Sequence, residues 1–282
     1  MSTFARRTLA VLATAAVSVG VLSTPAEAAD ASRYVALGDS FTAGPLLSVP
    51  VGSPLGCLRS NNNYPSLVAE ALDADEFVDV SCSGATTEDM FNAQSTTLGT
   101  NDPQLDALDA DTTLVSLGIG GNDVGFVSIL VDCLKKGALN PFGSPCQDYY
   151  GDELSQRIAD TVPDLNAVLA EIGNRAPNAE VVVVGYPAIF PETGGCWPKL
   201  AIGSGDIPYL DGVEQELNAA LADAAAANGA TYVSTYERGH DVCQQKEDRW
   251  VEGIIPTQWA APAHPNAAGM EGAAAATLAA IG

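Results

Sequence analysis

Four short segments, far apart in the chain, carry residues that could perform acyl transfer together. Ser40 follows the apolar run Tyr34–Leu37 and lies in a Gly-Asp-Ser turn. Gly84 lies in Ser-Gly-Ala-Thr, Asn122 in Gly-Gly-Asn-Asp, and His264 in His-Pro-Asn near the C-terminus. Acyl transfer needs a nucleophile, a base that takes its proton, and hydrogen-bond donors for the oxyanion. The four residue types meet these three needs.

Each of these residues has a predicted role. We expect Ser40 to be the nucleophile and His264 to be the general base and acid. The backbone N–H groups of Ser40 and Gly84 and the side-chain amide of Asn122 are the candidate oxyanion donors. A glycine lets a substrate oxygen approach the backbone because it has no Cβ. The other histidine, His240, is expected to pack within a surface loop.

Alternating strand and helix patterns explain how these residues could meet. Such alternation predicts an α/β fold with a mainly parallel sheet, in which ligands bind at the carboxyl ends of the strands. Ser40, Gly84 and Asn122 each lie just after an expected strand, so we expect them at one edge. The expected strands are Tyr34–Leu37, Phe77–Val80, Thr112–Leu117, Val181–Val184 and Thr231–Val233. The expected helices are Pro65–Leu72, Asp123–Leu134, Asp152–Arg175 (kinked or split at Pro163), Pro208–Asn228 and Pro265–Ala280.

The first 28 residues have the pattern of a secretory signal peptide. Arg6 and Arg7 precede a short apolar stretch, and Ala26-Glu27-Ala28 fits a cleavage site. We therefore expect export and a mature chain of residues 29–282 that folds as a single domain. The apolar stretch is too short for a spanning helix, which predicts no stable membrane anchor.

The charge of the chain argues against nucleic acid as a partner. There are 12 basic and 35 acidic residues, a net charge of −23. Removing residues 1–28 takes away two arginines and one glutamate, which leaves a net charge of −24. Scattered acidity of this kind disfavours nucleic acid and anionic membranes and favours solubility outside the cell. A monomer is the simplest expectation.

All six cysteines lie in the expected mature chain and predict three disulfides. An even number in an exported protein is typical of a disulfide framework, although six cysteines allow fifteen pairings. Sequential pairing is the simplest: Cys57–Cys82, Cys133–Cys146 and Cys196–Cys243. With no CxxC motif and only two histidines, the sequence predicts no metal site and no cofactor.

Taken together, the four segments resemble the GDSL, or SGNH, family of serine esterases and lipases. The resemblance runs from Gly38 to His264 in the order that the family follows, and the cysteine pattern is similar to its secreted actinobacterial branch. It implies a three-layer α/β/α, flavodoxin-like sandwich around a five-stranded sheet. It also implies ester hydrolysis through an acyl-enzyme without a metal.

One departure from the family pattern concerns the orientation of His264. Most of the family carries an acid three residues before this histidine, where the chain has Ala261. The resemblance implies that a main-chain carbonyl, of Ala261 or Pro262, orients the ring instead. Asp241 could serve only if its loop folds back. A carbonyl can select the tautomer with a proton on Nδ1, although it stabilises the imidazolium less than a carboxylate does.

The expected function is hydrolysis of carboxylic esters, with acyl lipids (triacylglycerol or phospholipid) as the expected substrates. A carbohydrate deacetylase on the same fold is the alternative within enzymes. A non-catalytic secreted binding module is the alternative of another class. Pro45–Pro50 could line an acyl pocket, meet a lipid surface or simply pack as a loop, and Trp259 is the tryptophan expected nearest to substrate.

Overall fold

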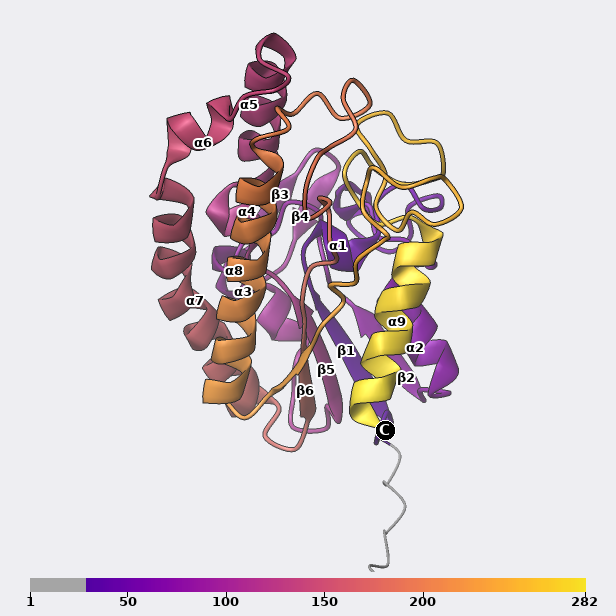
Figure 1. Ribbon diagram of the computed structural model, residues 1–282. Helices are drawn as coiled ribbons and strands as arrows, with labels where there is room; N and C mark the ends of the chain where they lie inside the picture. The colour runs from indigo at the N-terminus through magenta and orange to yellow at the C-terminus, as the bar shows by residue number, and fades with distance from the viewer. Residues whose placement is uncertain (1–28) are drawn as a thin grey trace, which may run out of the picture.

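A five-stranded parallel sheet forms the middle layer of the protein. The computed structural model describes residues 29–282, so the predicted signal peptide lies outside the described residues (Figure 1). All four strand pairings are parallel. The strand order is β2-β1-β5-β6-β7, with β1 at Arg33–Gly38, β2 at Glu76–Asp79, β5 at Leu114–Gly118, β6 at Glu180–Val184 and β7 at Thr231–Val233.

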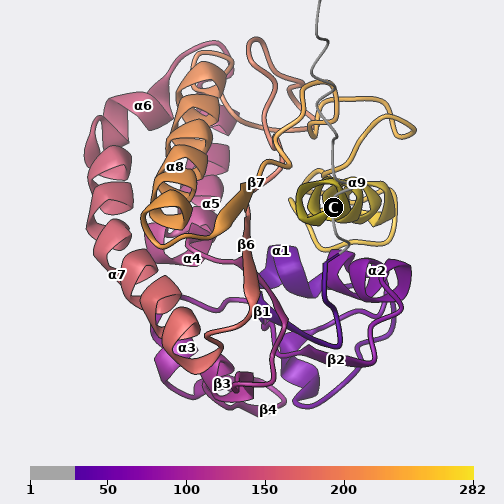
Figure 2. The same ribbon diagram turned by 90° about the horizontal axis from the view of Figure 1, so that it is seen from below.

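Helices cover both faces of this sheet, which confirms the predicted three-layer fold. Figure 2 shows α2 (Tyr64–Ala71) and α9 (Ala267–Ile281) on one face. The opposite face carries the larger layer of helices. That layer contains α3 (Glu88–Phe91), α4 (Gly121–Val124), α5 (Phe126–Leu139), α6 (Pro145–Tyr150), α7 (Glu153–Arg175) and α8 (Ile207–Ala227).

The central strands are apolar on both faces because each face packs into a separate core. In β1, Val35 and Leu37 belong to the larger core, which includes residues of α5, α7 and α8. Tyr34 and Ala36 belong to the smaller core, which includes residues of α2 and α9. This alternation follows from the two-residue repeat of a strand. Full burial on both sides explains why the strand runs could be predicted from composition.

Two helices differ from the prediction, one at Gly125 and the other at Pro163. The helix expected over Asp123–Leu134 is divided at Gly125, whose φ of 89° ends α4 and precedes α5. The expected split at Pro163 is absent, and α7 runs unbroken. Pro163 lies on the exposed side of this helix, while the opposite side packs into the core. That packing compensates for the missing backbone hydrogen bond.

Short elements outside the sheet were not predicted. The strands β3 (Gln94–Thr96) and β4 (Gly99–Asn101) form a separate antiparallel hairpin. The four-residue helix α1 (Ser40–Ala43) directly follows β1, and two 3₁₀ turns lie at Leu55–Cys57 and Gln104–Ala107. Elements this short carry too few residues for a periodic pattern.

Three disulfides cross-link the chain, and one of them joins α5 to α6. The sulfur atoms are paired as Cys57–Cys82, Cys133–Cys146 and Cys196–Cys243. Among residues 29–282, no helix has both the length and the apolar content needed to span a bilayer.

Candidate active site

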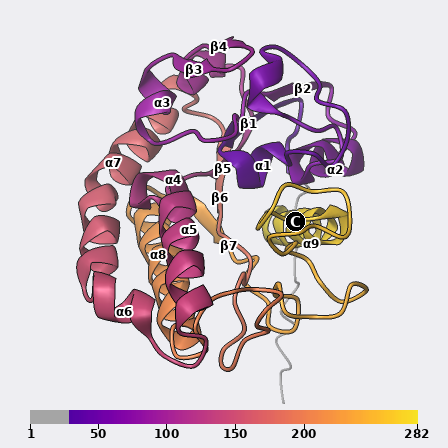
Figure 3. The same ribbon diagram turned by 90° about the horizontal axis from the view of Figure 1, so that it is seen from above.

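The candidate nucleophile is presented by a tight turn at the carboxyl end of β1. Asp39 caps α1, because its Oδ1 accepts a hydrogen bond from the Phe41 N–H at 2.8 Å. Gly38 has a φ of 151°, and a Cβ there would lie 2.3 Å from Oγ1 of Thr42. The turn therefore needs glycine before Asp39 and places Ser40 as the first residue of α1. Seen from above, α1 lies over the end of β1, between α4 and the loops before α9 (Figure 3).

Ser40 and His264 are in direct contact despite their separation in sequence. Nε2 of His264 lies 2.8 Å from Oγ of Ser40, and Nδ1 lies 2.8 Å from the carbonyl oxygen of Pro262. A carbonyl can only accept, so Nδ1 carries the proton and donates to Pro262. Nε2 is then the acceptor for the Ser40 hydroxyl proton, which is the arrangement that general-base catalysis requires.

The other candidates for orienting His264 are engaged elsewhere. The carbonyl of Ala261 accepts the backbone N–H of His264 at 3.2 Å. The carboxylate of Asp241 accepts from the Cys243 N–H at 2.8 Å and from the Gln244 amide at 2.7 Å. Among the three candidates, only the Pro262 carbonyl contacts the imidazole ring.

Burial makes the neutral form of His264 more favourable. Desolvation lowers the pKa of the ring, and the hydrogen bond to Pro262 opposes this shift only in part. The ring of Phe41 packs against the imidazole with a centroid distance of 5.0 Å. A neutral imidazole is the form that can accept a proton from the serine.

Each candidate oxyanion donor has an N–H that the protein itself does not use. Within residues 29–282, the N–H groups of Ser40 and Gly84 have no protein acceptor. Gly84 has a φ of 84°, in the left-handed region that favours glycine. The Asn122 amide donates one N–H to the carbonyl of Ala85 at 2.9 Å and keeps its second N–H available.

Backbone contacts bring the Gly84 loop and the Ser40 turn together. The Cys82 N–H donates to the Gly38 carbonyl at 2.9 Å. The carboxylate of Asp123 accepts from the Thr87 N–H at 3.0 Å and also from its hydroxyl. Asp123 therefore ties the loop after β2 to α4, where Asn122 lies.

Tyr186 is a site residue that sequence reasoning missed. Its hydroxyl donates to Oδ2 of Asp39 at 2.6 Å and accepts from the Gly121 N–H at 2.8 Å. It thus joins the turn of the nucleophile to the turn of Asn122. Burial raises the pKa of Asp39 to about 7. The only sequence signal for Tyr186 was its position just after the strand run that ends at Val184.

An apolar pocket opens beside the serine and histidine. It encloses about 750 Å³ of space, part of it open to solvent. Ser40, Asn122 and His264 line its polar end. The remaining lining is mostly apolar and comes from α4, α5, α7, α8 and the segment after β6, through residues such as Phe126, Leu130, Ile158, Phe190, Val213 and Leu217.

Two parts of the chain that could have met the substrate do not line this pocket. No residue of Pro45–Pro50 is among the pocket residues. Trp259 is 80% exposed and is absent from the lining as well. The other histidine packs as expected, because the ring of His240 stacks on Trp250 at a centroid distance of 4.2 Å. The apolar pocket lies instead between the sheet edge and the larger helix layer.

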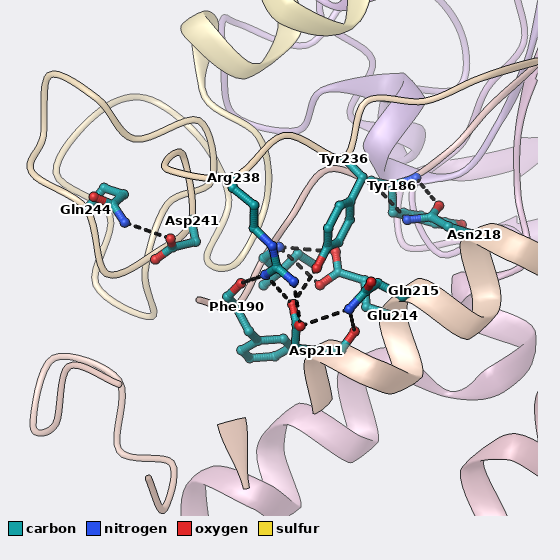
Figure 4. A network of polar contacts seen from close by, with 11 residues as sticks. Tyr186, Phe190, Asp211, Glu214, Gln215, Asn218, Tyr236, Arg238, Asp241 and Gln244 are labelled. Carbon is teal, nitrogen blue, oxygen red and sulfur yellow. Dashed lines mark hydrogen bonds and ion pairs between the residues drawn. The ribbon is translucent and has the colours of Figure 1, made fainter. Parts of the chain in front are cut away.

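A polar network supports the wall of the pocket on the side of α8 (Figure 4). Arg238 holds Asp211 through two hydrogen bonds of 2.7 and 2.8 Å. Glu214, one turn further along α8, lines the pocket and accepts the Ile189 N–H at 3.1 Å. Desolvation raises the pKa of Glu214 well above its usual range, which favours an uncharged carboxyl in this apolar setting.

No metal-binding cluster accompanies these residues. Across the described part of the chain, no group of three or more His, Cys, Asp or Glu side chains is arranged to hold a metal ion.

A three-layer sandwich with a serine–histidine contact beside an apolar pocket is the arrangement that a serine hydrolase would need. The profile of the GDSL-like Lipase/Acylhydrolase family matches residues 36–271. The chain belongs to this family, and it is a carboxylic ester hydrolase.

Several similar proteins come from Streptomyces. "Lipase 2" of Streptomyces coelicolor is 40% identical over 267 residues, which cover 92% of this chain and 89% of that protein. The crystal structure of phospholipase A1 from Streptomyces albidoflavus is similar with a TM-score of 0.73 and 30% identity, over 88% of this chain and 98% of that one. An extracellular lipase from Streptomyces rimosus has the same TM-score and coverage at 29% identity.

Proposed function

We propose that this protein is a secreted serine esterase or lipase that hydrolyses the carboxylic esters of acyl lipids, with Ser40 as nucleophile. The observation that carries the proposal is the 2.8 Å contact between Ser40 and the Nδ1-protonated His264, beside the apolar pocket. Relatives that are a lipase and a phospholipase A1 support the acyl-lipid substrate class. Three paired disulfides and the signal-peptide pattern support export.

The reaction divides into acylation and deacylation. Oγ of Ser40 attacks the ester carbonyl while Nε2 of His264 takes its proton, so that a tetrahedral oxyanion and an imidazolium form. The imidazolium then gives the proton to the leaving alkoxy oxygen, and the alcohol departs from the acyl-enzyme. Water attacks the acyl carbon as His264 takes a proton from it. The ring returns this proton to Oγ, and the free acid leaves.

The oxyanion is stabilised in both halves by three donors. These are the N–H groups of Ser40 and Gly84 and the free N–H of the Asn122 amide. Donors that are already in place cost no reorganisation when the charge develops. Each is worth about 3–4 kcal/mol of transition-state stabilisation by analogy with measured oxyanion donors.

The apolar pocket is the proposed binding site for the acyl chain. Its polar end holds Ser40 and His264, and its walls are the side chains of α5, α7 and α8. Burial of each CH₂ of a substrate chain in such a pocket contributes about 0.8 kcal/mol. A pocket of this kind favours chains of several carbons over an acetyl group.

The decisive experiment is hydrolysis of p-nitrophenyl esters from acetate to palmitate by the mature protein with EDTA present, beside Ser40→Ala. We expect activity on medium and long chains that is lost in a folded Ser40→Ala variant. Full activity in that variant would contradict the mechanism. Activity confined to acetate would favour a carbohydrate deacetylase, and a folded wild type that acts on no ester would favour a non-catalytic binding module.

A further inference from the structure

The peptide group between Ser83 and Gly84 is held by a side chain from the separate β3–β4 hairpin. Nε2 of Gln94, the first residue of β3, donates to the carbonyl oxygen of Ser83 at 3.0 Å. That carbonyl and the N–H of Gly84 belong to the same planar peptide unit, in which they point in opposite directions. A hydrogen bond that fixes the carbonyl therefore also fixes the direction of the Gly84 N–H.

The two neighbouring peptide groups are held by backbone hydrogen bonds instead. The Ser83 N–H donates to the carbonyl of Cys57 at 3.1 Å, and the Ala85 N–H donates to the carbonyl of Cys82 at 3.0 Å. For the peptide unit joining Ser83 to Gly84, the bond from Gln94 is the one restraint found within residues 29–282. Glycine is the residue whose backbone rotates most freely. The peptide unit that joins Ser83 to Gly84 therefore needs an external hydrogen bond more than its two neighbours do.

The hairpin that carries Gln94 is tied to the same loop. The Asn101 amide in β4 donates to the carbonyl of Val80 at 3.2 Å. Arg59 donates to Oδ1 of Asn101 at 3.3 Å and to the carbonyl of Ser81 at 2.8 Å. The hairpin and the loop after β2 therefore form one hydrogen-bonded unit. Because this hairpin is not part of the main sheet, its clearest contribution is to the position of that loop.

We propose that Gln94 is a positioning residue for the oxyanion hole. Its hydrogen bond to the Ser83 carbonyl orients and polarises the N–H of Gly84. The inference rests on the proposed function, in which that N–H binds the oxyanion. Hydrogen bonds in series strengthen one another, so a donor on the Ser83 carbonyl makes the Gly84 N–H a better donor. Gln94 does not itself touch the substrate.

The first test compares Gln94→Ala with wild type on a p-nitrophenyl ester. We expect kcat to fall about tenfold, less than the 10²–10³ lost with a whole oxyanion donor, while KM stays unchanged. The inhibition constant of an alkyl trifluoromethyl ketone, which forms a tetrahedral adduct with the serine, should rise by a similar factor. Ser95→Ala, at the exposed next residue of the same strand, is the matched control and should change neither constant.

A second variant separates hydrogen bonding from packing. Gln94→Glu has nearly the same shape, but an ionised carboxylate cannot donate to the Ser83 carbonyl. A protonated carboxyl can donate. We expect the ratio of its kcat to that of wild type to rise as the pH falls through the pKa of the new carboxyl. Taking the ratio removes the common pH dependence of His264.

The outcomes separate this inference from the proposed function. Suppose that folded Gln94→Ala and Gln94→Glu keep the wild-type kcat and inhibition constant, while Asn122→Ala has a lower kcat and a higher inhibition constant. The role of Gln94 is then wrong, and the proposed oxyanion hole is still supported. A pH-independent ratio for Gln94→Glu would also overturn the role. If Asn122→Ala and Ser40→Ala are as active as wild type, the proposed function itself fails.

Discussion

At the scale of single residues, a neutral carbonyl contacts the proposed catalytic histidine where a serine hydrolase triad has an acid. The Pro262 oxygen selects the Nδ1-protonated ring, but it supplies no negative charge to stabilise an imidazolium. Burial lowers the pKa of His264 further. In the proposed mechanism His264 therefore stays neutral, and able to accept a proton, down to a lower pH. It is a weaker base than the histidine of a Ser-His-Asp triad.

This arrangement predicts the pH dependence of the reaction. As the pH falls through the pKa of His264, the ring gains a proton and can no longer accept one from Ser40. The acid limb of kcat/KM should therefore have its midpoint below 6.5, the ordinary value for histidine. A pH profile of kcat/KM on a soluble ester checks this, and a midpoint clearly above 6.5 would contradict it.

Asp39 provides the control for that measurement. Burial raises its pKa to about 7, so it is a second group that could titrate near the nucleophile. Asp39→Asn removes this titration. If the acid limb belongs to His264, its midpoint should be the same in Asp39→Asn and in wild type.

The residues of the site differ in how far the sequence could predict them. The position of Ser40, Gly84 and Asn122 could be predicted because each follows a strand run, and parallel strands end at one edge. The choice between Ala261 and Pro262 was open because every residue has a backbone carbonyl. Only the path of the chain decides which of the two carbonyls meets the imidazole.

At the scale of elements, the start of α9 positions His264. Asn266 caps this helix by accepting the Gly269 N–H at 3.1 Å. Its amide also donates to the carbonyl of Arg249 at 2.7 Å and to Oε1 of Glu252 at 3.1 Å. The Glu252 N–H in turn donates to the carbonyl of His264 at 2.9 Å. The asparagine of the His-Pro-Asn segment therefore supports the histidine rather than the chemistry.

Loss of this support should be measurable as stability. Asn266→Ala removes the helix cap and leaves the buried Glu252 with one donor fewer, which should cost about 2–4 kcal/mol of unfolding free energy. Denaturant unfolding followed by circular dichroism measures the change. Asn92→Ala, at an exposed asparagine, should cost much less. Equal effects of the two substitutions would contradict this role.

The elements that the sequence missed share a physical cause. The β3–β4 hairpin has three residues in each strand, and α1 has four residues in all. Such elements are held by tertiary contacts and by caps such as Asp39, not by a repeating apolar pattern. The long helices were predicted well because their apolar stripes span several turns.

At the scale of the whole molecule, a disulfide links the stability of the fold to the Gly84 loop. Cys57–Cys82 closes a loop of 25 residues, and Cys82 lies two residues before Gly84. Replacing both cysteines by serine should lower the unfolding free energy by about 3–4 kcal/mol, from the chain entropy of a loop of this length. Because the pair also holds the loop of Gly84, a proposed oxyanion donor, we expect kcat to fall at a temperature where the variant is folded.

The Cys196–Cys243 pair is the control for this prediction. It closes a loop of 47 residues, and neither cysteine lines the pocket. Its double serine variant should lose stability to a similar degree while kcat stays near the wild-type value. Equal falls of kcat in both double variants would contradict a specific role for Cys57–Cys82.

The pocket between the sheet edge and the larger helix layer should set the preference for chain length. Val213, a partly buried residue of α8, lines this pocket. Val213→Trp should shift the preferred p-nitrophenyl ester toward shorter chains, because the indole fills space that the chain would use. Val213→Ala should not produce that shift. An unchanged chain-length profile in Val213→Trp would place the acyl chain elsewhere.

The central claim, that Ser40 is a nucleophile activated by His264, is tested most directly by covalent labelling. The mature protein is treated with an alkyl organophosphonate, and the adduct is located by intact-mass measurement and peptide mapping. We predict one adduct per chain, on Ser40, and none in Ser40→Ala or, at the same exposure, in His264→Ala. Wild-type protein that is folded and remains unlabelled, or is labelled at another residue, would contradict the account.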